Sequence, residues 1–140
     1  MATGQRTHFT WATNQGPILG KVNKPIATVA LKKSTGDWQT FIVLVDSGAT
    51  ISIFNRDDCD LLGYKLKNGQ RLDIQGVTGH SIPCYVHSVE MRVGTERFQT
   101  RVAFSDSEPH ELLLGRIDVF DRFEVDLRGK TLDTFLVSEI

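Results

Sequence analysis

Short strands separated by turns account for most of the hydrophobic pattern in this chain. Residues 26–31 are rich in β-branched side chains, and after a turn at 34–37 the chain continues in a second extended segment, 38–45. The end of that segment, 41–45, is apolar at every position. A strand with this pattern is typically covered on both faces. We therefore predict a central strand pair with 41–45 as its most buried part.

Three further segments have hairpin patterns. In 65–74 the dipeptide Asn68-Gly69 lies between alternating runs, which is a strong hairpin signal. Apolar residues also alternate on both sides of the turn at 94–96. Residues 123–137 have the pattern of a last hairpin. Together these segments predict antiparallel strands with one buried face.

Helix signals are few and short. Asn55 is a suitable N-cap for a helix that runs to Leu62, and Gly63 is a suitable stop. A second short helix is expected over 117–122. A parallel sheet would need longer crossover helices than these. The pattern therefore predicts an all-β fold, a small barrel or sandwich with one or two short helices.

Length and composition limit the function classes. The 140 residues fit one domain, in which we expect 1–24 to be a loosely ordered lead-in and 25–140 to be the folded domain. The net charge of -1 indicates no nucleic-acid partner and no polybasic membrane patch. No signal peptide or membrane-spanning run is visible in the sequence. We therefore expect a cytoplasmic protein that binds proteins or peptides.

Disulfide and metal sites are not indicated. Cys59 and Cys84 are too few for a disulfide scaffold and leave room for one bridge at most. Cys84 and His87 have a metal-like spacing, but together with His80 and Cys59 they are scattered rather than paired as zinc ligands are. We expect neither a metal nor a cofactor.

Asp46 interrupts the apolar pattern at the end of the buried segment. A carboxylate in apolar surroundings is costly unless it gains a partner or shifts its pKa. Ser47 offers a hydroxyl that can tie the turn together, and Gly48 permits a close backbone path. Such a loop can hold a carboxylate rigidly at a reachable position, as a general base requires. The structural alternative is a capping carboxylate in a β-turn.

The run Asp-Ser-Gly-Ala after an apolar strand resembles the active-site loop of the retroviral-like (retropepsin) aspartic proteases. The residues that correspond to this loop are Asp46, Ser47, Gly48, Ala49 and Thr50. A second apolar-apolar-glycine loop, which packs beside the first in that family, is similar to Leu113, Leu114, Gly115 and Arg116. The family's glycine-bearing flap, which closes over bound peptide, resembles Gly76, Val77, Thr78, Gly79, His80, Ser81 and Ile82. The three elements occur in the family's order.

The resemblance implies a closed barrel of the retropepsin type and an aspartic endopeptidase activity. In this family two facing carboxylates share one proton and activate a water between them. The chain has a single Asp-[Ser/Thr]-Gly triplet, so the resemblance implies a homodimer in which Asp46 of each chain meets across a twofold axis. It also implies that Ser47 bonds across this axis. The implied substrates are extended, mainly apolar segments of proteins or peptides.

One position departs from the pattern of the viral enzymes. They commonly carry an acidic residue where this chain has Thr50, and that residue pairs with the arginine after the second glycine. Arg116 therefore needs another partner.

Residues 97–108 echo 37–48 and align Asp106 with Asp46. Because Glu108 replaces the glycine of the triplet, we predict that Asp106 is an ordinary loop residue and not a second catalytic aspartate.

A non-catalytic role is the competing interpretation. Retropepsin-like folds can serve as dimerisation or peptide-binding modules, which hold an extended peptide without cutting it. Gly76 and Gly79 would then be ordinary hairpin glycines. The intact Asp-Ser-Gly triplet favours the enzyme.

Overall fold

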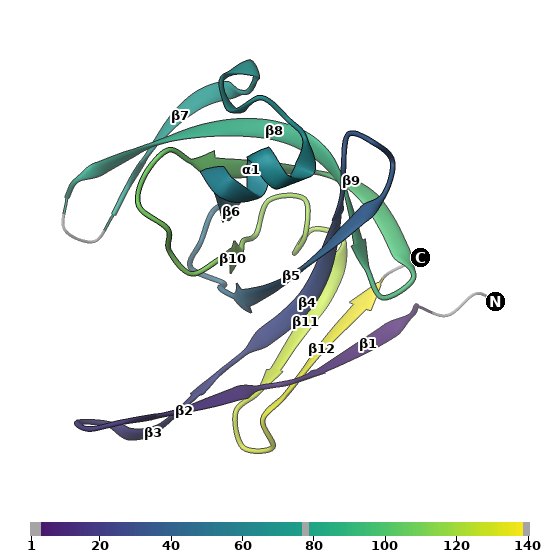
Figure 1. Ribbon diagram of the computed structural model, residues 1–140. Helices are drawn as coiled ribbons and strands as arrows, with labels where there is room; N and C mark the ends of the chain where they lie inside the picture. The colour runs from purple at the N-terminus through teal and green to yellow at the C-terminus, as the bar shows by residue number, and fades with distance from the viewer. Residues whose placement is uncertain (1–3, 77–78, 139–140) are drawn as a thin grey trace.

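The computed structural model of the chain describes residues 4–76 and 79–138 (Figure 1). Strands make up most of its regular structure. They are β1 Arg6–Thr10, β2 Ala12–Gly16, β3 Gly20–Lys24, β4 Ile26–Lys32, β5 Trp38–Val45, β6 Ser52–Asn55, β7 Gln70–Gln75, β8 Ser81–Val93, β9 Glu96–Ser105, β10 Leu113–Leu114, β11 Phe123–Arg128 and β12 Asp133–Ser138. The helical elements are α1, Arg56–Leu62, and a single 3-10 turn, η1, Leu66–Asn68. No helix in the described ranges is long and apolar enough to cross a membrane.

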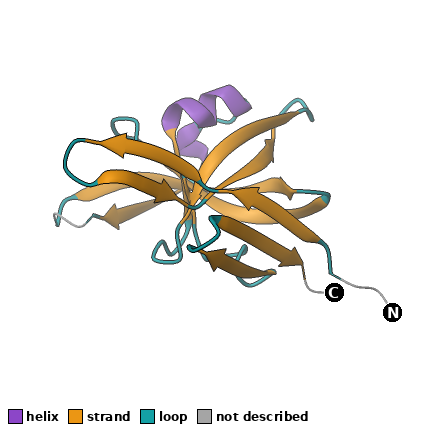
Figure 2. Cartoon of the chain, turned by 90° about the horizontal axis from the view of Figure 1, so that it is seen from below, coloured by secondary structure: helices purple, strands orange, loops and turns teal. Residues whose placement is uncertain are grey.

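Six strands close into a ring, in the order β4, β5, β10, β6, β9 and β8. The ring closes because β8 also pairs with β4, where Leu31 lies opposite Met91. Closure removes the unpaired edges that an open sheet would expose. β7 pairs with the outer part of β8 and forms a long hairpin that projects from the ring (Figures 1 and 2). The predicted small all-β barrel with short helices is confirmed.

Apolar side chains from opposite walls fill the ring. Phe54 and Phe104 are fully buried, and Phe41 packs edge-on against Phe54 with 5.2 Å between ring centroids. Met91 and Leu114 are also fully buried in this cluster. Burial of a side chain of this size contributes about 1.5–3 kcal/mol. The core thereby holds together the ends of β5, β6 and β10, which carry the loops of interest.

The uniformly apolar segment 41–45 is not covered on both faces, so this prediction was wrong. Phe41, Val43 and Val45 point into the core, whereas Leu44 is half-buried and the Ile42 side chain is 64% exposed. A strand in the wall of a small barrel alternates between inside and outside. Its outer face therefore remains open in the single chain.

The loosely ordered lead-in predicted for 1–24 is also wrong for its described part, which forms β1, β2 and β3. β1 pairs with β12 from the other end of the chain, and β12 pairs with β11, which gives a three-stranded sheet. The sequence pattern did not reveal β1 as a strand, because its two half-buried residues are Thr7 and Phe9. A threonine does not stand out in a hydrophobic pattern. Residue 25 therefore does not mark the start of the ordered structure.

The local predictions had mixed outcomes. α1 begins after Asn55, whose backbone N–H donates to the Asp58 carboxylate at 2.8 Å, and it ends at Gly63 in the left-handed conformation, as expected. The hairpins at 94–96 and 123–137 are confirmed. The hairpin predicted at Asn68-Gly69 is wrong, because 66–68 form η1 and β7 pairs forward with β8. Residues 117–122 form turns rather than a helix.

A partly buried side-chain hydrogen bond joins β12 to the residue that follows β1. The Trp11 indole Nε1–H donates to Thr134 Oγ1 at 2.8 Å, and Thr134 is fully buried. We expect Thr134→Val, which keeps the shape and removes the acceptor, to lower the free energy of unfolding by about 1 kcal/mol. Chemical denaturation at fixed protein concentration measures this.

Thr100→Val is the matched control. Thr100 is an equally buried strand threonine whose hydroxyl makes a long 3.5 Å contact with the Arg101 carbonyl. We expect it to be neutral or slightly stabilising. Equal effects of the two substitutions would contradict the role given to the Trp11 bond.

Candidate active site

Asp46 lies in a tight turn directly after β5, and backbone bonds hold it there. Its N–H donates to the Leu114 carbonyl at 3.0 Å, and its own carbonyl accepts from Ala49 N–H at 3.1 Å. The carboxylate Oδ1 accepts a hydrogen bond from Gly48 N–H at 2.9 Å. Asp46 is half-buried and lines the adjoining cleft. The side chain is therefore both oriented and reachable.

The second loop crosses the first at Gly115. A Cβ atom on Gly115 would lie 2.4 Å from the Ile51 carbonyl carbon and 2.8 Å from Ser52 N, which no side chain tolerates. Gly115 N–H donates to the buried Ser52 hydroxyl at 2.9 Å. The crossing thus requires glycine because of close backbone approach, and its φ is not in the left-handed region.

Further backbone bonds tie the two loops together. Arg116 N–H donates to the Ala49 carbonyl at 3.0 Å, and Ile117 N–H donates to the Thr50 carbonyl at 2.9 Å. The Arg116 guanidinium donates to the Ser47 carbonyl and to Thr50 Oγ1, both at 3.4 Å. The arginine therefore finds its partners within the Asp46 loop, although Thr50 stands where an acidic residue was expected.

The sequence echo has a structural counterpart. β5 runs parallel to β10, and β9 runs parallel to β6, so each half of the barrel repeats the same strand arrangement. Asp106 follows β9 as Asp46 follows β5. Its carboxylate binds Arg56 Nη1 at 2.8 Å and does not line the cleft beside Asp46. This placement fits the expectation that Asp106 is a loop residue.

A cleft of about 710 Å³ opens beside Asp46. Its floor is formed by the Asp46 loop and the strand that follows, with Asp46, Gly48, Ala49, Thr50, Ile51 and Ile53. The β7–β8 hairpin supplies Leu72, Ile74, Gln75, Gly76, Ile82 and Cys84. The opposite wall is formed by Ser105, His110, Glu111, Leu113 and Ile117. Most of these side chains are apolar, so the cleft can desolvate a bound chain segment.

The flap residues proposed from the sequence divide into three groups. Gly76 and Ile82 line the cleft, whereas Gly79, His80 and Ser81 are exposed beyond it. Gly76 N–H donates to the His80 carbonyl at 3.0 Å, and Gly79 has a φ of 83°, as a tight turn requires. Val77 and Thr78 lie outside the described residues. The hairpin therefore borders the cleft from one side.

Sequence reasoning missed the wall formed by the segment before the second loop. His110 Nδ1 donates to the Glu111 carbonyl at 2.7 Å, and Nε2 forms a hydrogen bond of 2.8 Å with the Ser105 hydroxyl. Asn55 exchanges two hydrogen bonds with the His110 backbone, each 3.0 Å long. The polar sequence of this segment resembles an ordinary loop, and its nearness to Leu113 was the only available signal.

The two cysteines are free and buried. Burial raises the pKa of the Cys59 and Cys84 thiols to about 11 each, so both stay neutral. His87 Nε2 donates to the Leu66 carbonyl at 2.9 Å. No group of three or more His, Cys, Asp and Glu side chains within 4–76 and 79–138 is arranged to hold a metal ion.

Comparison with known proteins assigns the family. A model of the family described as "Aspartyl protease" matches residues 29–116, which span both loops and the β7–β8 hairpin. The chain belongs to the aspartyl protease family. No curated protein matches the sequence significantly.

Two solved structures resemble the fold of this aspartyl protease. A retropepsin-like aspartic protease from Rickettsia conorii matches with a TM-score of 0.59 and 14% identity over 99% of this chain and 96% of that chain. The EIAV protease, complexed with the inhibitor HBY-793, matches with a TM-score of 0.52 and 23% identity over 66% of this chain and 82% of that chain. The fold is therefore retropepsin-like.

The loop crossing in this aspartyl protease is testable through Gly115. We expect Gly115→Ala to lower the free energy of unfolding by about 1–3 kcal/mol, because its Cβ would force the two backbones apart. Gly76→Ala is the control in the same cleft, since its Cβ would lie an ordinary 3.7 Å from the His80 carbonyl. Equal stability of the two variants in chemical denaturation would show that the backbones do not cross as closely as described.

Proposed function

We propose that this aspartyl protease is an endopeptidase that works as a homodimer, with one Asp46 carboxylate from each chain. The observation that carries the proposal is the fixed position of Asp46 in the lining of an apolar cleft. Its carboxylate accepts from Gly48 N–H, and its own N–H donates to the Leu114 carbonyl. No other Asp-[Ser/Thr]-Gly triplet is present to supply a second aspartate from the same chain. A twofold axis through the Asp46 loops would supply it.

The chemistry follows from two close carboxylates. Like charges a few ångströms apart cannot both ionise, so the pair holds one shared proton. The charged Asp46 takes a proton from a water placed between the two, and that water attacks the peptide carbonyl carbon. The protonated Asp46 of the partner chain meanwhile donates its proton to the carbonyl oxygen, which gives a neutral tetrahedral intermediate. The C–N bond then breaks as the proton that the first Asp46 took from the water passes to the leaving amine nitrogen, and the hydroxyl proton returns to the partner's Asp46 as the new carboxyl group forms. These steps need only the two carboxylates and the water.

The cleft supports extended, mainly apolar peptide segments as substrates. Its lining is dominated by aliphatic side chains such as Ile53, Ile74 and Leu113, which would cover substrate side chains. The β7–β8 hairpin borders the cleft and offers backbone groups to an extended chain. A segment enclosed on both sides is shielded from bulk water, which strengthens the electrostatics of the reacting groups.

Replacing Asp46 tests the proposal directly. Asp46→Asn keeps an oxygen that can accept the Gly48 N–H bond, so the loop should keep its shape while the general base is lost. We expect hydrolysis of an unstructured protein substrate at acidic pH to fall by about 10³-fold or more. The dimer should still form, as measured by sedimentation.

Asp106→Asn is the matched control, since Asp106 occupies the equivalent place after β9 and binds Arg56 instead of facing the cleft. It should keep activity within a few-fold of wild type. If the wild-type dimer cuts nothing at any pH but binds extended peptides, the non-catalytic module becomes the correct account.

The dimer requirement gives a second test. Specific activity should fall on dilution, in step with the dimer fraction, because a monomer holds one Asp46 and cannot form the pair. Activity should also fall as the pH rises and the shared proton is lost. Stopped assays over a dilution series, paired with sedimentation at the same concentrations, measure both. A fully active monomer would refute the shared site.

A further inference from the structure

The hairpin of β2 and β3, residues 12–24, joins neither of the larger sheets in the described chain, and we call it the arm. β2 and β3 pair with each other and with no other described strand. The tip carries Ile18 and Leu19, whose exposed fractions of 92% and 79% are the highest among the large apolar residues described. Two adjacent apolar side chains on a projecting tip gain nothing from folding of the monomer, and so indicate a contact outside it.

The root of the arm lies beside the Asp46 loop. The Pro25 carbonyl, just after the arm, accepts a hydrogen bond of 2.8 Å from Val45 N–H, and Val45 directly precedes Asp46. Lys24 at the end of the arm forms an ion pair of 3.2 Å with Glu111, which lines the cleft. The arm is therefore anchored at the rim of the active-site cleft.

The arm and the β7–β8 hairpin project from the same end of the molecule in two perpendicular views (Figures 1 and 2). The ends of β5 and β10 lie between the two projections in Figure 1. Both hairpins therefore project on the side of the molecule where β5 ends and the Asp46 loop begins.

We propose that the arm is a dimerisation element whose tip packs Ile18 and Leu19 against the second copy of this chain. The inference rests on the proposed function, in which the two Asp46 carboxylates meet at a twofold axis. That axis then passes close to the root of each arm. Strands of five residues reach roughly 17 Å, so the arm extends past the axis along the partner. By twofold symmetry each copy gives and receives one arm.

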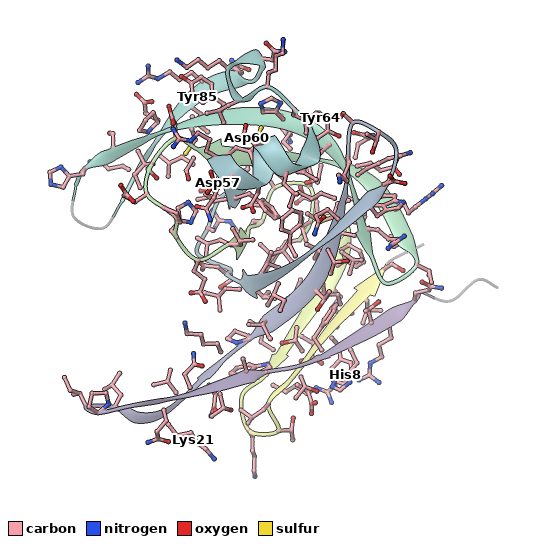
Figure 3. All side chains as sticks on the ribbon, in the orientation of Figure 1. His8, Lys21, Asp57, Asp60, Tyr64 and Tyr85 are labelled. Carbon is pink, nitrogen blue, oxygen red and sulfur yellow. The ribbon has the colours of Figure 1, made fainter. Side chains whose placement is uncertain are left out.

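The composition of the arm fits a protein surface as its target. Residues 12–20 carry no charged side chain, and no acidic residue occurs in 12–24. Of the two lysines, Lys24 is held by Glu111, and Lys21 lies on the arm well away from the labelled acidic residues of α1 (Figure 3). An apolar tip with a polar stem is typical of interface segments that bury their ends on a partner.

The test is the double variant Ile18→Lys/Leu19→Lys, which should fold normally because both side chains are exposed. We expect its dimer dissociation constant, measured by sedimentation equilibrium, to rise by roughly tenfold or more. Activity at low protein concentration should fall in proportion and should recover at high concentration. Leu61→Lys is the matched control, since Leu61 is a 49% exposed leucine on α1, and α1 lies far from β2 and β3 in Figure 1.

A labelling experiment reports on the tip itself. The native thiols of Cys59 and Cys84 are buried, so an environment-sensitive fluorophore would react with Ile18→Cys alone. Its emission should shift to the blue as the dimer forms, whereas a label at Leu61→Cys should not change.

The outcomes separate the arm from the proposed function. The double substitution Ile18→Lys/Leu19→Lys can leave the dissociation constant of the dimer unchanged. That result overturns the role of the arm in dimerisation and leaves the protease proposal intact. If the dissociation constant is unchanged and KM rises, the arm contributes to substrate binding instead of dimerisation, and the inference is also overturned. If the wild-type chain stays monomeric and inactive at all concentrations, both the proposed function and the role of the arm in dimerisation are overturned.

Discussion

The close crossing of two backbone segments at Gly115 is the constraint on which this molecule depends. Bonds from Asp46, Arg116 and Ile117 join the two loops, and the absence of a side chain at position 115 lets the backbones approach to contact. A carboxylate on a surface loop would sample many orientations and lose entropy on each catalytic encounter. Here the entropy is lost once, during folding. Closure of the barrel encloses β10 between β5 and β6, which delivers the second loop directly beneath the first.

The two halves of the barrel share one geometry but differ in chemistry, since one loop presents Asp46 to the cleft and the other ties Asp106 to Arg56. Under the proposed function, a single chain therefore supplies one of the two carboxylates of the active site. Two features of the monomer are left without partners in the described chain. The arm is rooted beside Asp46, and the outer face of β5 exposes Ile42. In the proposed dimer, catalysis and assembly would use the same surface, and activity would then depend on protein concentration.

Features that rest on neighbouring residues could be predicted from the sequence alone. The Asp46 turn, the caps of α1 at Asn55 and Gly63 and the hairpin at 94–96 all depend on local backbone preferences, which act over a few positions. The second loop at Gly115 was identified through the family resemblance instead, because its glycine is required by a contact with Ile51 and Ser52 far away in the sequence. The family resemblance placed these pieces in order and identified the barrel that joins them.

Features that join distant residues became visible only in the folded chain. The pairing of β1 with β12, the partners of Arg116 and the wall of Ser105 and His110 depend on contacts between residues far apart in the chain, or on which face of a strand turns inward. The alternation of 41–45 has the same origin, because an apolar run carries no mark of which side chains the barrel will leave outside. Local preference cannot encode such contacts, since their energy exists only once the barrel has closed.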